Sequence, residues 1–146
     1  MVDMHGNSVK TLRQELLKQR KDFAVGANYS QASAALIASL NNFLVKEGAA
    51  FRSIALYWPI QDEIDLRPAL SIWAKSAIGR LLALPVARPD KHLDFYEWQE
   101  GDRLIPSEYG IPEPDPSNIA RPAIHPDCIL IPCVGWSSSV IDGKNH

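Results

Sequence analysis

Apolar side chains recur at helical spacing in two stretches of the first fifty residues. The first set comprises Val9, Leu12, Leu16 and Leu17. The second set comprises Leu36, Ile37, Leu40, Phe43 and Leu44. Residues three and four apart share one face of a helix, so each set predicts an amphipathic helix. Ser8 is suited to cap the start of the first helix, and Gly48 the end of the second.

Shorter, nearly continuous apolar runs follow and predict buried strands. Residues 53–58 form the first run, which Pro59 closes because proline cannot donate to a sheet ladder. Leu81 to Val86 form the second run. Leu93 to Trp98 and Cys128 to Pro132 are further strand candidates.

A third helix is expected between the first two strands. Asp65 can cap its start, Pro68 is tolerated in its first turn, and Gly79 lies just past its end. A strand, a helix and a second strand with short connections form a βαβ unit, which builds parallel sheets with helices on their faces. The expected class is therefore α/β: a three-layer sandwich with a mostly parallel sheet flanked by helices.

Length and proline usage indicate how the chain is organised. Its 146 residues are the usual size of one domain, so residues 1–146 are expected to form a single domain. All 11 prolines fall at or after Pro59, and the proline-rich span from Pro106 to Pro132 is expected to be an ordered surface loop.

Composition and charge exclude several classes of protein. The formal net charge is −2, whereas a protein that coats nucleic acid is strongly basic. No apolar run is long enough to span a membrane, and residues 1–14 contain no apolar secretory segment. With two cysteines, a reducing cytoplasm is the expected location. The acidic stretch 90–118 is expected to be a solvated face.

Motifs for several kinds of chemistry are absent. Cys128 and Cys133 are five apart, so on one strand they would point to opposite faces and share neither a metal nor a disulfide; they are expected to be small hydrophobic residues of a buried strand. The histidines are scattered and form no ligand pair, so no metal site is predicted. Neither a dinucleotide-binding glycine motif nor a phosphate-binding P-loop is present.

Three features can carry function. Lys10 to Arg13 place basic side chains near the expected first turn of a helix, where cations and free N–H groups suit a phosphate. Trp58 to Ile64 follow a buried strand, and ligands bind beyond the carboxyl ends of such strands. A solvated helix face and helix-capping acids are the plainer readings of these two features. The third feature is the pair of segments Gly110 to Pro114 and Asp127 to Gly135.

Taken in order, these pieces resemble the 5-formyltetrahydrofolate cyclo-ligases, also called methenyltetrahydrofolate synthetases. The matching segments run from about residue 9 to about residue 136. They are Lys10-Thr-Leu-Arg13 with Arg20, Gln61-Asp62-Glu63-Ile64, Leu84-Pro85-Val86, Leu93-Asp94-Phe95, Gly110-Ile-Pro-Glu-Pro114 and Asp127-Cys-Ile-Leu-Ile-Pro-Cys-Val-Gly135. From Ser137 the resemblance ends, and the family's C-terminal glycine-rich segment has no counterpart. The resemblance therefore implies a shortened or frame-shifted chain that lacks the family's C-terminal elements.

The resemblance implies an activity and its site residues. The family uses ATP and Mg²⁺ to close 5-formyltetrahydrofolate into 5,10-methenyltetrahydrofolate, with release of ADP and phosphate. By position, Arg13 would contact ATP, and Lys10 is the nearest basic residue to the family's lysine, whose place Val9 takes. Trp58, Glu63 and Tyr109 would line the folate site. The expected protein is a cytoplasmic monomer that acts on small molecules.

Two alternative hypotheses stay open. A chain without the glycine-rich segment could bind folate through Trp58 and Glu63 without turning it over. An unrelated α/β module could instead use its basic first helix to meet an acidic partner.

Overall fold

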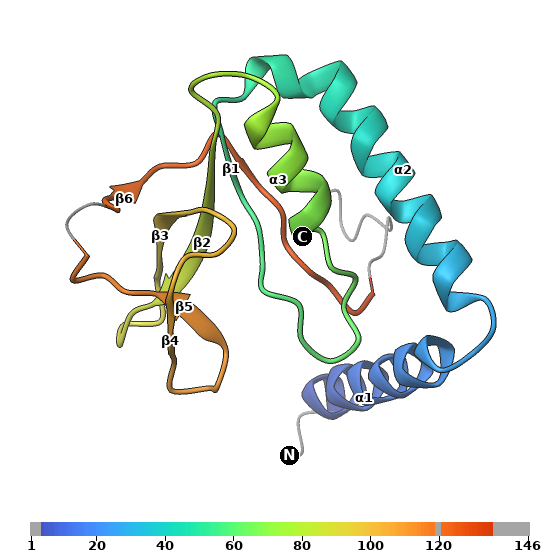
Figure 1. The fold of residues 1–146 in the computed structure, drawn as a ribbon. Coiled ribbons are helices and arrows are strands. Elements are labelled where there is room, and N and C mark those ends of the chain that lie inside the picture. Colours follow the sequence, from blue (N-terminus) through green and yellow to red (C-terminus); the bar gives the residue numbers. More distant parts are fainter. Residues whose placement is uncertain (1–3, 119–120, 136–146) are drawn as a thin grey trace, which may run out of the picture.

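The computed structural model describes residues 4–118 and 121–135, which form three helices and two sheets (Figure 1). The helices are α1 (Met4–Ala24), α2 (Tyr29–Glu47) and α3 (Arg67–Lys75), with a short 3₁₀ turn, η1 (Gly48–Ala50). The strands are β1 (Ser53–Ala55), β2 (Leu81–Ala87), β3 (Leu93–Trp98), β4 (Leu104–Pro106), β5 (Pro112–Pro114), β6 (Ala123–Ile124) and β7 (Cys128–Ile129). None of the described helices is both long and apolar enough to cross a bilayer.

The main sheet confirms the α/β class but differs from the prediction in strand direction. Its strand order is β6-β3-β2-β1-β7. β1 runs parallel to β2 and to β7, as the βαβ pattern predicts. β3 runs antiparallel to both β2 and β6, so the expectation of a mostly parallel sheet is wrong. The reason is the short link between β2 and β3, because only antiparallel neighbours can be joined without a long crossover.

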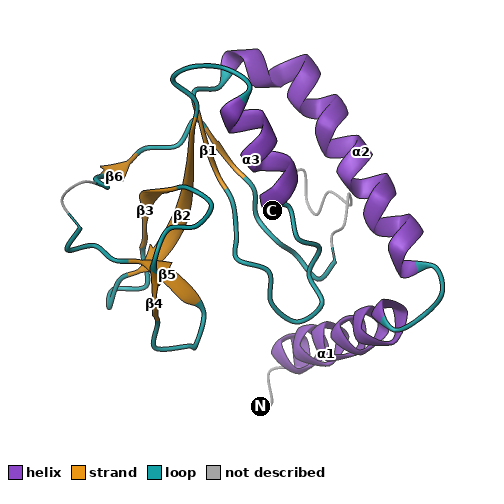
Figure 2. Cartoon of the chain, viewed as in Figure 1, coloured by secondary structure: helices purple, strands orange, loops and turns teal. Residues whose placement is uncertain are grey.

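The helices flank this sheet, as expected. α2 and α3 lie side by side on one side of β1 and β2 (Figures 1 and 2). α1 runs beneath them, next to the loop that leaves β1 (Figure 1). Leu16 of α1 also approaches the segment after β7, since a Cβ added to Gly135 would lie 2.8 Å from Leu16 Cδ1.

The observed helix ends agree only in part with those that the apolar pattern predicts. α1 begins at Met4, so Ser8 lies inside the helix and is not its cap. Val9 and Leu12 of the predicted apolar face are 66% and 55% exposed. Gly48 does follow the last residue of α2, as predicted. α3 begins at Arg67, whose backbone N–H donates to Asp65 Oδ1 at 3.0 Å, so Asp65 satisfies a free donor at the helix start.

The proline-rich span also contains more regular structure than expected. β5 and β6 lie within the predicted loop from Pro106 to Pro132, and β4 and β5 pair as a separate two-stranded sheet. The strand predicted at Cys128 to Pro132 is present as β7 but ends at Ile129. Short strands are hard to predict there because proline and polar residues mask the period-two pattern. The predicted first strand is likewise shorter, although Leu56 still donates its N–H to Ala83 O.

The core joins α2, α3 and the centre of the sheet. Its largest fully buried side chains come from β1, the segment after it, α3 and β2; they are Ile54, Leu56, Leu70 and Leu84. Trp73 and Trp98 are nearly as buried and close the cluster from α3 and β3. Burial of this kind is worth about 25 cal/mol per Å² of apolar surface.

A single carboxylate ties β7 to β1. Asp127 Oδ2 accepts from the backbone N–H of Arg52 at 2.8 Å and of Ser53 at 3.2 Å. The N–H of Asp127 donates to Ser53 O and Oγ in return. This reciprocal set fixes the register of the edge strand that leads to the candidate site.

Truncating Leu70 tests the core. Leu70 has no exposed surface, whereas Ile72 on the same helix is 71% exposed. We expect Leu70→Ala to lower the free energy of unfolding by about 2 to 5 kcal/mol through lost burial and a residual cavity. The matched change Ile72→Ala should alter it by less than about 0.5 kcal/mol. Urea unfolding measures the free energy of unfolding of both variants. Equal losses in the two would show that Leu70 is not a core residue.

Candidate functional site

The loop between β1 and α3 turns back on itself and presents Glu63. The N–H of Glu63 donates to Ile60 O, and Ile60 N–H donates to Glu63 Oε1, both at 2.9 Å. Gln61 and Asp62 have φ values of 49° and 66°, so both central residues of the turn are left-handed. A turn with two positive φ angles is tight and reverses the chain at once. Glu63 is thereby held against Ile60 at the base of the turn.

Two tyrosines fasten this loop to the fold. The Tyr57 hydroxyl donates to Ile64 O at 2.9 Å. The Tyr29 hydroxyl, at the start of α2, donates to Asp62 O at 3.5 Å. The loop is therefore braced internally by Tyr57 and attached to α2 by Tyr29.

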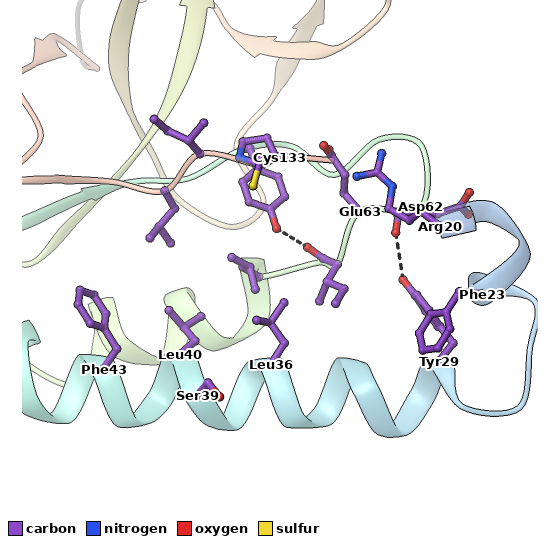
Figure 3. A pocket seen from close by; sticks show the side chains of 16 residues that line it. Arg20, Phe23, Tyr29, Leu36, Ser39, Leu40, Phe43, Asp62, Glu63 and Cys133 are labelled. Carbon is purple, nitrogen blue, oxygen red and sulfur yellow. Dashed lines mark hydrogen bonds between the residues drawn. The ribbon is translucent and has the colours of Figure 1, made fainter. Parts of the chain in front are cut away.

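A cavity of about 650 Å³ lies between this loop, α1, α2 and the segment after β7. Apolar side chains of α2 form one wall, among them Leu36, Leu40 and Phe43 (Figure 3). Arg20, Asp62 and Glu63 gather at the opposite, polar end (Figure 3). An apolar cavity of this size with a few converging polar groups is typical of a small-molecule site.

Arg20 is the cation of this cavity and is incompletely satisfied. Its Nε is buried and has no hydrogen-bond partner among the described residues. No ion pair joins its guanidinium to Asp62 or Glu63 within the same described part of the chain. A buried guanidinium N–H without a partner costs free energy.

Burial raises the pKa of the Tyr57 phenol from its usual 10.0 to about 12, and the Glu63 and Asp65 carboxylates add to the rise. The Arg20 guanidinium acts in the opposite direction. Tyr57 is consequently a neutral hydrogen-bond donor in the cavity wall at any ordinary pH.

Trp58 and Tyr109 line a different, smaller cavity. It measures about 120 Å³ and lies between the β4–β5 hairpin and the ends of β1 and β2. Trp58 already has partners: Arg67 Cζ lies 4.0 Å from its ring centroid, and Trp98 meets its ring edge-on at 6.4 Å. The structure thus brings Trp58 to Tyr109 but assigns Glu63 to the larger cavity.

Lys10 and Arg13 lie on the exposed face of α1. They line none of the cavities described above. Because α1 begins at Met4, they are about two turns inside the helix, beyond the free N–H groups of its start. The predicted combination of cations with a helix N-terminus is therefore wrong for these two residues.

The two cysteines of the chain lie in β7 and shortly after it. Cys128 and Cys133 are both free, in agreement with the spacing argument. Cys133, however, is exposed at the rim of the larger cavity rather than buried in a strand. Across residues 4–118 and 121–135, no three His, Cys, Asp or Glu side chains come together to hold a metal.

Sequence reasoning missed Tyr29 and Tyr57 as lining residues and quoted Arg20 without a role. Tyr29 precedes Leu36 by seven residues and so continues the same helical face, which was a usable signal. Arg20 follows Arg13 by the same interval on α1. Tyr57 lies next to Trp58 on a strand end, where neighbours point to opposite sides. The predicted departure from Ser137 onward lies outside the described residues.

Comparison with solved structures shows what this fold resembles. The chain superposes on the NMR structure of 5,10-methenyltetrahydrofolate synthetase from Aquifex aeolicus with a TM-score of 0.60 and 22% sequence identity. The match covers 88% of this chain and 69% of that chain. No protein-family model and no curated protein sequence matches the chain. The likeness therefore shows the fold, which is that of a methenyltetrahydrofolate synthetase.

The Tyr57 phenol offers a direct test of the cavity wall. Because its folded pKa is raised, its contribution to the free energy of unfolding is complete below pH 10 and is lost as the pH rises toward about 12. Phenolate absorbance should show one late-titrating tyrosine that Tyr57→Phe removes. Glu63→Gln should lower the pKa of Tyr57, and Glu47→Gln, the same change on the exposed end of α2, should not. If Tyr57→Phe instead removed a tyrosine that titrates near the usual pKa of 10.0, Tyr57 would not be the buried phenol of the cavity wall.

Proposed function

We propose that the chain catalyses the ATP-dependent cyclisation of 5-formyltetrahydrofolate to 5,10-methenyltetrahydrofolate. One observation carries the proposal: Glu63 lies in the wall of a 650 Å³ cavity beyond the carboxyl end of β1, within a synthetase fold. In open α/β sheets, ligands bind at that end of the strands. The ordered sequence segments of this family support the same assignment.

The reaction needs positioning more than covalent help from the protein. The formyl oxygen attacks the γ-phosphorus and its bond to ADP breaks. The folate N10 then attacks the formyl carbon and loses its proton, and the carbon–oxygen bond breaks to release phosphate. Holding the formyl group and the γ-phosphate in line supplies most of the acceleration in such a transfer.

Each proposed binding residue has a chemically suitable role. The Glu63 carboxylate accepts hydrogen bonds from pterin N–H groups. Trp58 and Tyr109 offer flat apolar surface to the ring system from the smaller cavity. Arg20 offers a cation to anionic parts of the substrates.

The phosphates of ATP need cations as well. Lys10 and Arg13 are the proposed partners, and both are exposed and free to meet a ligand. Mg²⁺ would enter with the nucleotide, carried by its phosphates, because the described residues provide no ligand cluster of their own.

A second candidate function is folate binding without turnover. It is favoured by the separation of the groups: Glu63 and Arg20 line the cavity, whereas Lys10 and Arg13 lie outside it. Titration with 5-formyltetrahydrofolate in the absence of ATP, followed by the turnover assay, distinguishes the two functions.

Replacement of Glu63 tests the folate site. We expect folded Glu63→Gln to bind 5-formyltetrahydrofolate at least about tenfold more weakly, because hydrogen bonds to a charged group are worth about 1.5 to 3 kcal/mol. Glu47→Gln removes the same charge from an exposed helix end and should leave binding unchanged. Calorimetry measures the affinity, and methenyl absorbance measures turnover. Equal affinity in both variants would remove Glu63 from the site.

Replacement of Arg13 tests the nucleotide contact. Arg13→Gln should raise KM for ATP about tenfold through loss of a charge-assisted hydrogen bond, with KM for folate unchanged. Lys18→Gln, the same loss of charge on the exposed surface of α1, is the control. A KM for ATP that is equal in the two variants would mean that α1 does not hold the phosphates at Arg13.

A further inference from the structure

The smaller cavity, which Trp58 and Tyr109 line, also contains the carboxylate of Glu113 in β5. Glu113 is the one fully charged residue among the described residues that line it, and most of the others are apolar. The volume of about 120 Å³ suits one six-membered ring, because a protein cavity of about 150 Å³ holds benzene. Tyr109 is 76% exposed, so the rest of a longer ligand could leave the cavity on its side. The cavity therefore combines aromatic surface with one anionic acceptor.

The Trp58 ring is fixed in position on one face. Arg67 Cζ lies 4.0 Å from the ring centroid, and Asp65 holds that guanidinium through hydrogen bonds of 2.8 Å and 2.9 Å. Trp98, which is buried, meets the same ring edge-on. A flat ligand that stacks on Trp58 must use the opposite face, and the ring is already held in place to receive it.

Glu113 is anchored through one carboxylate oxygen and leaves the other accessible. Its Oε2 accepts the backbone N–H of Ala87 at 2.8 Å, which ties β5 to the end of β2. Its Oε1 accepts no hydrogen bond from the described part of the chain. This oxygen is not one of the buried unpartnered atoms, so solvent reaches it. The carboxylate is therefore held in place with a free acceptor.

The charges beside Glu113 leave it without a cation. Glu113 forms no ion pair within residues 4–118 and 121–135. Arg88, the residue that follows β2, is shared by Asp90 at 3.0 Å and Asp94 at 3.4 Å. Acidic groups thus outnumber basic ones at this end of β2. A ligand that donates hydrogen bonds is favoured there over an anion, because a carboxylate acceptor forms charge-assisted hydrogen bonds.

We propose that Glu113 is a specificity-determining residue that selects a flat ring with two adjacent N–H donors, the pyrimidine edge of a pterin. The ring stacks on the open face of Trp58, and Glu113 accepts from the N3–H and the 2-amino group. Oε2 keeps its bond to Ala87, because each carboxylate oxygen can accept twice. The identity of the ligand rests on the proposed function, to which Glu113 adds the group that recognises this edge.

Pterin and lumazine are the matched probes, since lumazine carries an oxo group in place of the 2-amino group of pterin. Calorimetry on the folded 146-residue chain should give saturable pterin binding with a Kd below about 1 mM and lumazine binding at least about tenfold weaker. Glu113→Gln keeps an oxygen for the Ala87 N–H but replaces the free acceptor with a donor. It should weaken pterin binding about tenfold and remove the preference over lumazine.

Glu108→Gln is the matched control, because it removes the same charge from an exposed residue of the same β4–β5 hairpin. It should leave both affinities unchanged. If Glu113→Gln does not fold, the comparison of pterin with lumazine on the unchanged chain keeps the test decisive. The proposal is overturned if pterin does not saturate, if the unchanged chain binds both probes equally, or if Glu113→Gln keeps the preference.

These results are distinct from a failure of the proposed function. A chain that selects pterin through Glu113 but forms no methenyl product with ATP keeps this site and loses the proposed turnover. A chain that turns over with the same KM for 5-formyltetrahydrofolate before and after Glu113→Gln keeps the proposed function and overturns the role of Glu113.

Discussion

The pairing of β1 on both of its edges is the constraint on which the rest of the molecule depends. β2 bonds to one edge and β7 to the other, both in parallel. Ile54 and Ala55 have no exposed surface, so the strand cannot shift without exposing the core. Asp127 adds a second lock by accepting two backbone N–H groups at the start of β1. The point at which the chain leaves the sheet is thereby fixed.

That exit point determines which residues meet. Successive side chains at a strand end point to opposite sides, so Tyr57 lines the larger cavity and Trp58 the smaller one. The left-handed turn at Gln61 and Asp62 then returns Glu63 to the same cavity as Tyr57. A ligand that used both Trp58 and Glu63 would have to reach around this loop. The loop therefore contributes residues to both cavities.

Elements with a strong apolar period were predicted correctly from the sequence. Helix starts, strand directions and the grouping of site residues were not. The bounds of β3 match the prediction, and the βαβ unit is confirmed, because apolar runs and short connections are local signals. The start of α1 was wrong because the helix continues through residues that carry no apolar period. The antiparallel direction of β3 follows from its short link to β2, a local signal that the expectation of a mostly parallel sheet did not use. Trp58 and Glu63 line different cavities because the turn between them has positive φ angles at Gln61 and Asp62. Residues other than glycine rarely adopt such angles, so the sequence gives no sign of this turn.

Buried polar atoms without a hydrogen-bond partner mark positions where the sequence does not maximise stability. In the described part of the chain these buried atoms are Arg20 Nε, Ser33 Oγ, Ser71 Oγ and Trp73 Nε1. Trp73 Nε1 is enclosed, since a Cβ on Gly48 would lie 2.9 Å from it, and no ligand could reach it there. Of the other three, only Arg20 Nε belongs to a residue that lines the larger cavity. An apolar residue at that position would remove the cost of an unmet hydrogen bond, so stability alone does not account for its polarity. The proposed function does account for it, because there the charge of Arg20 meets an anionic part of the substrates.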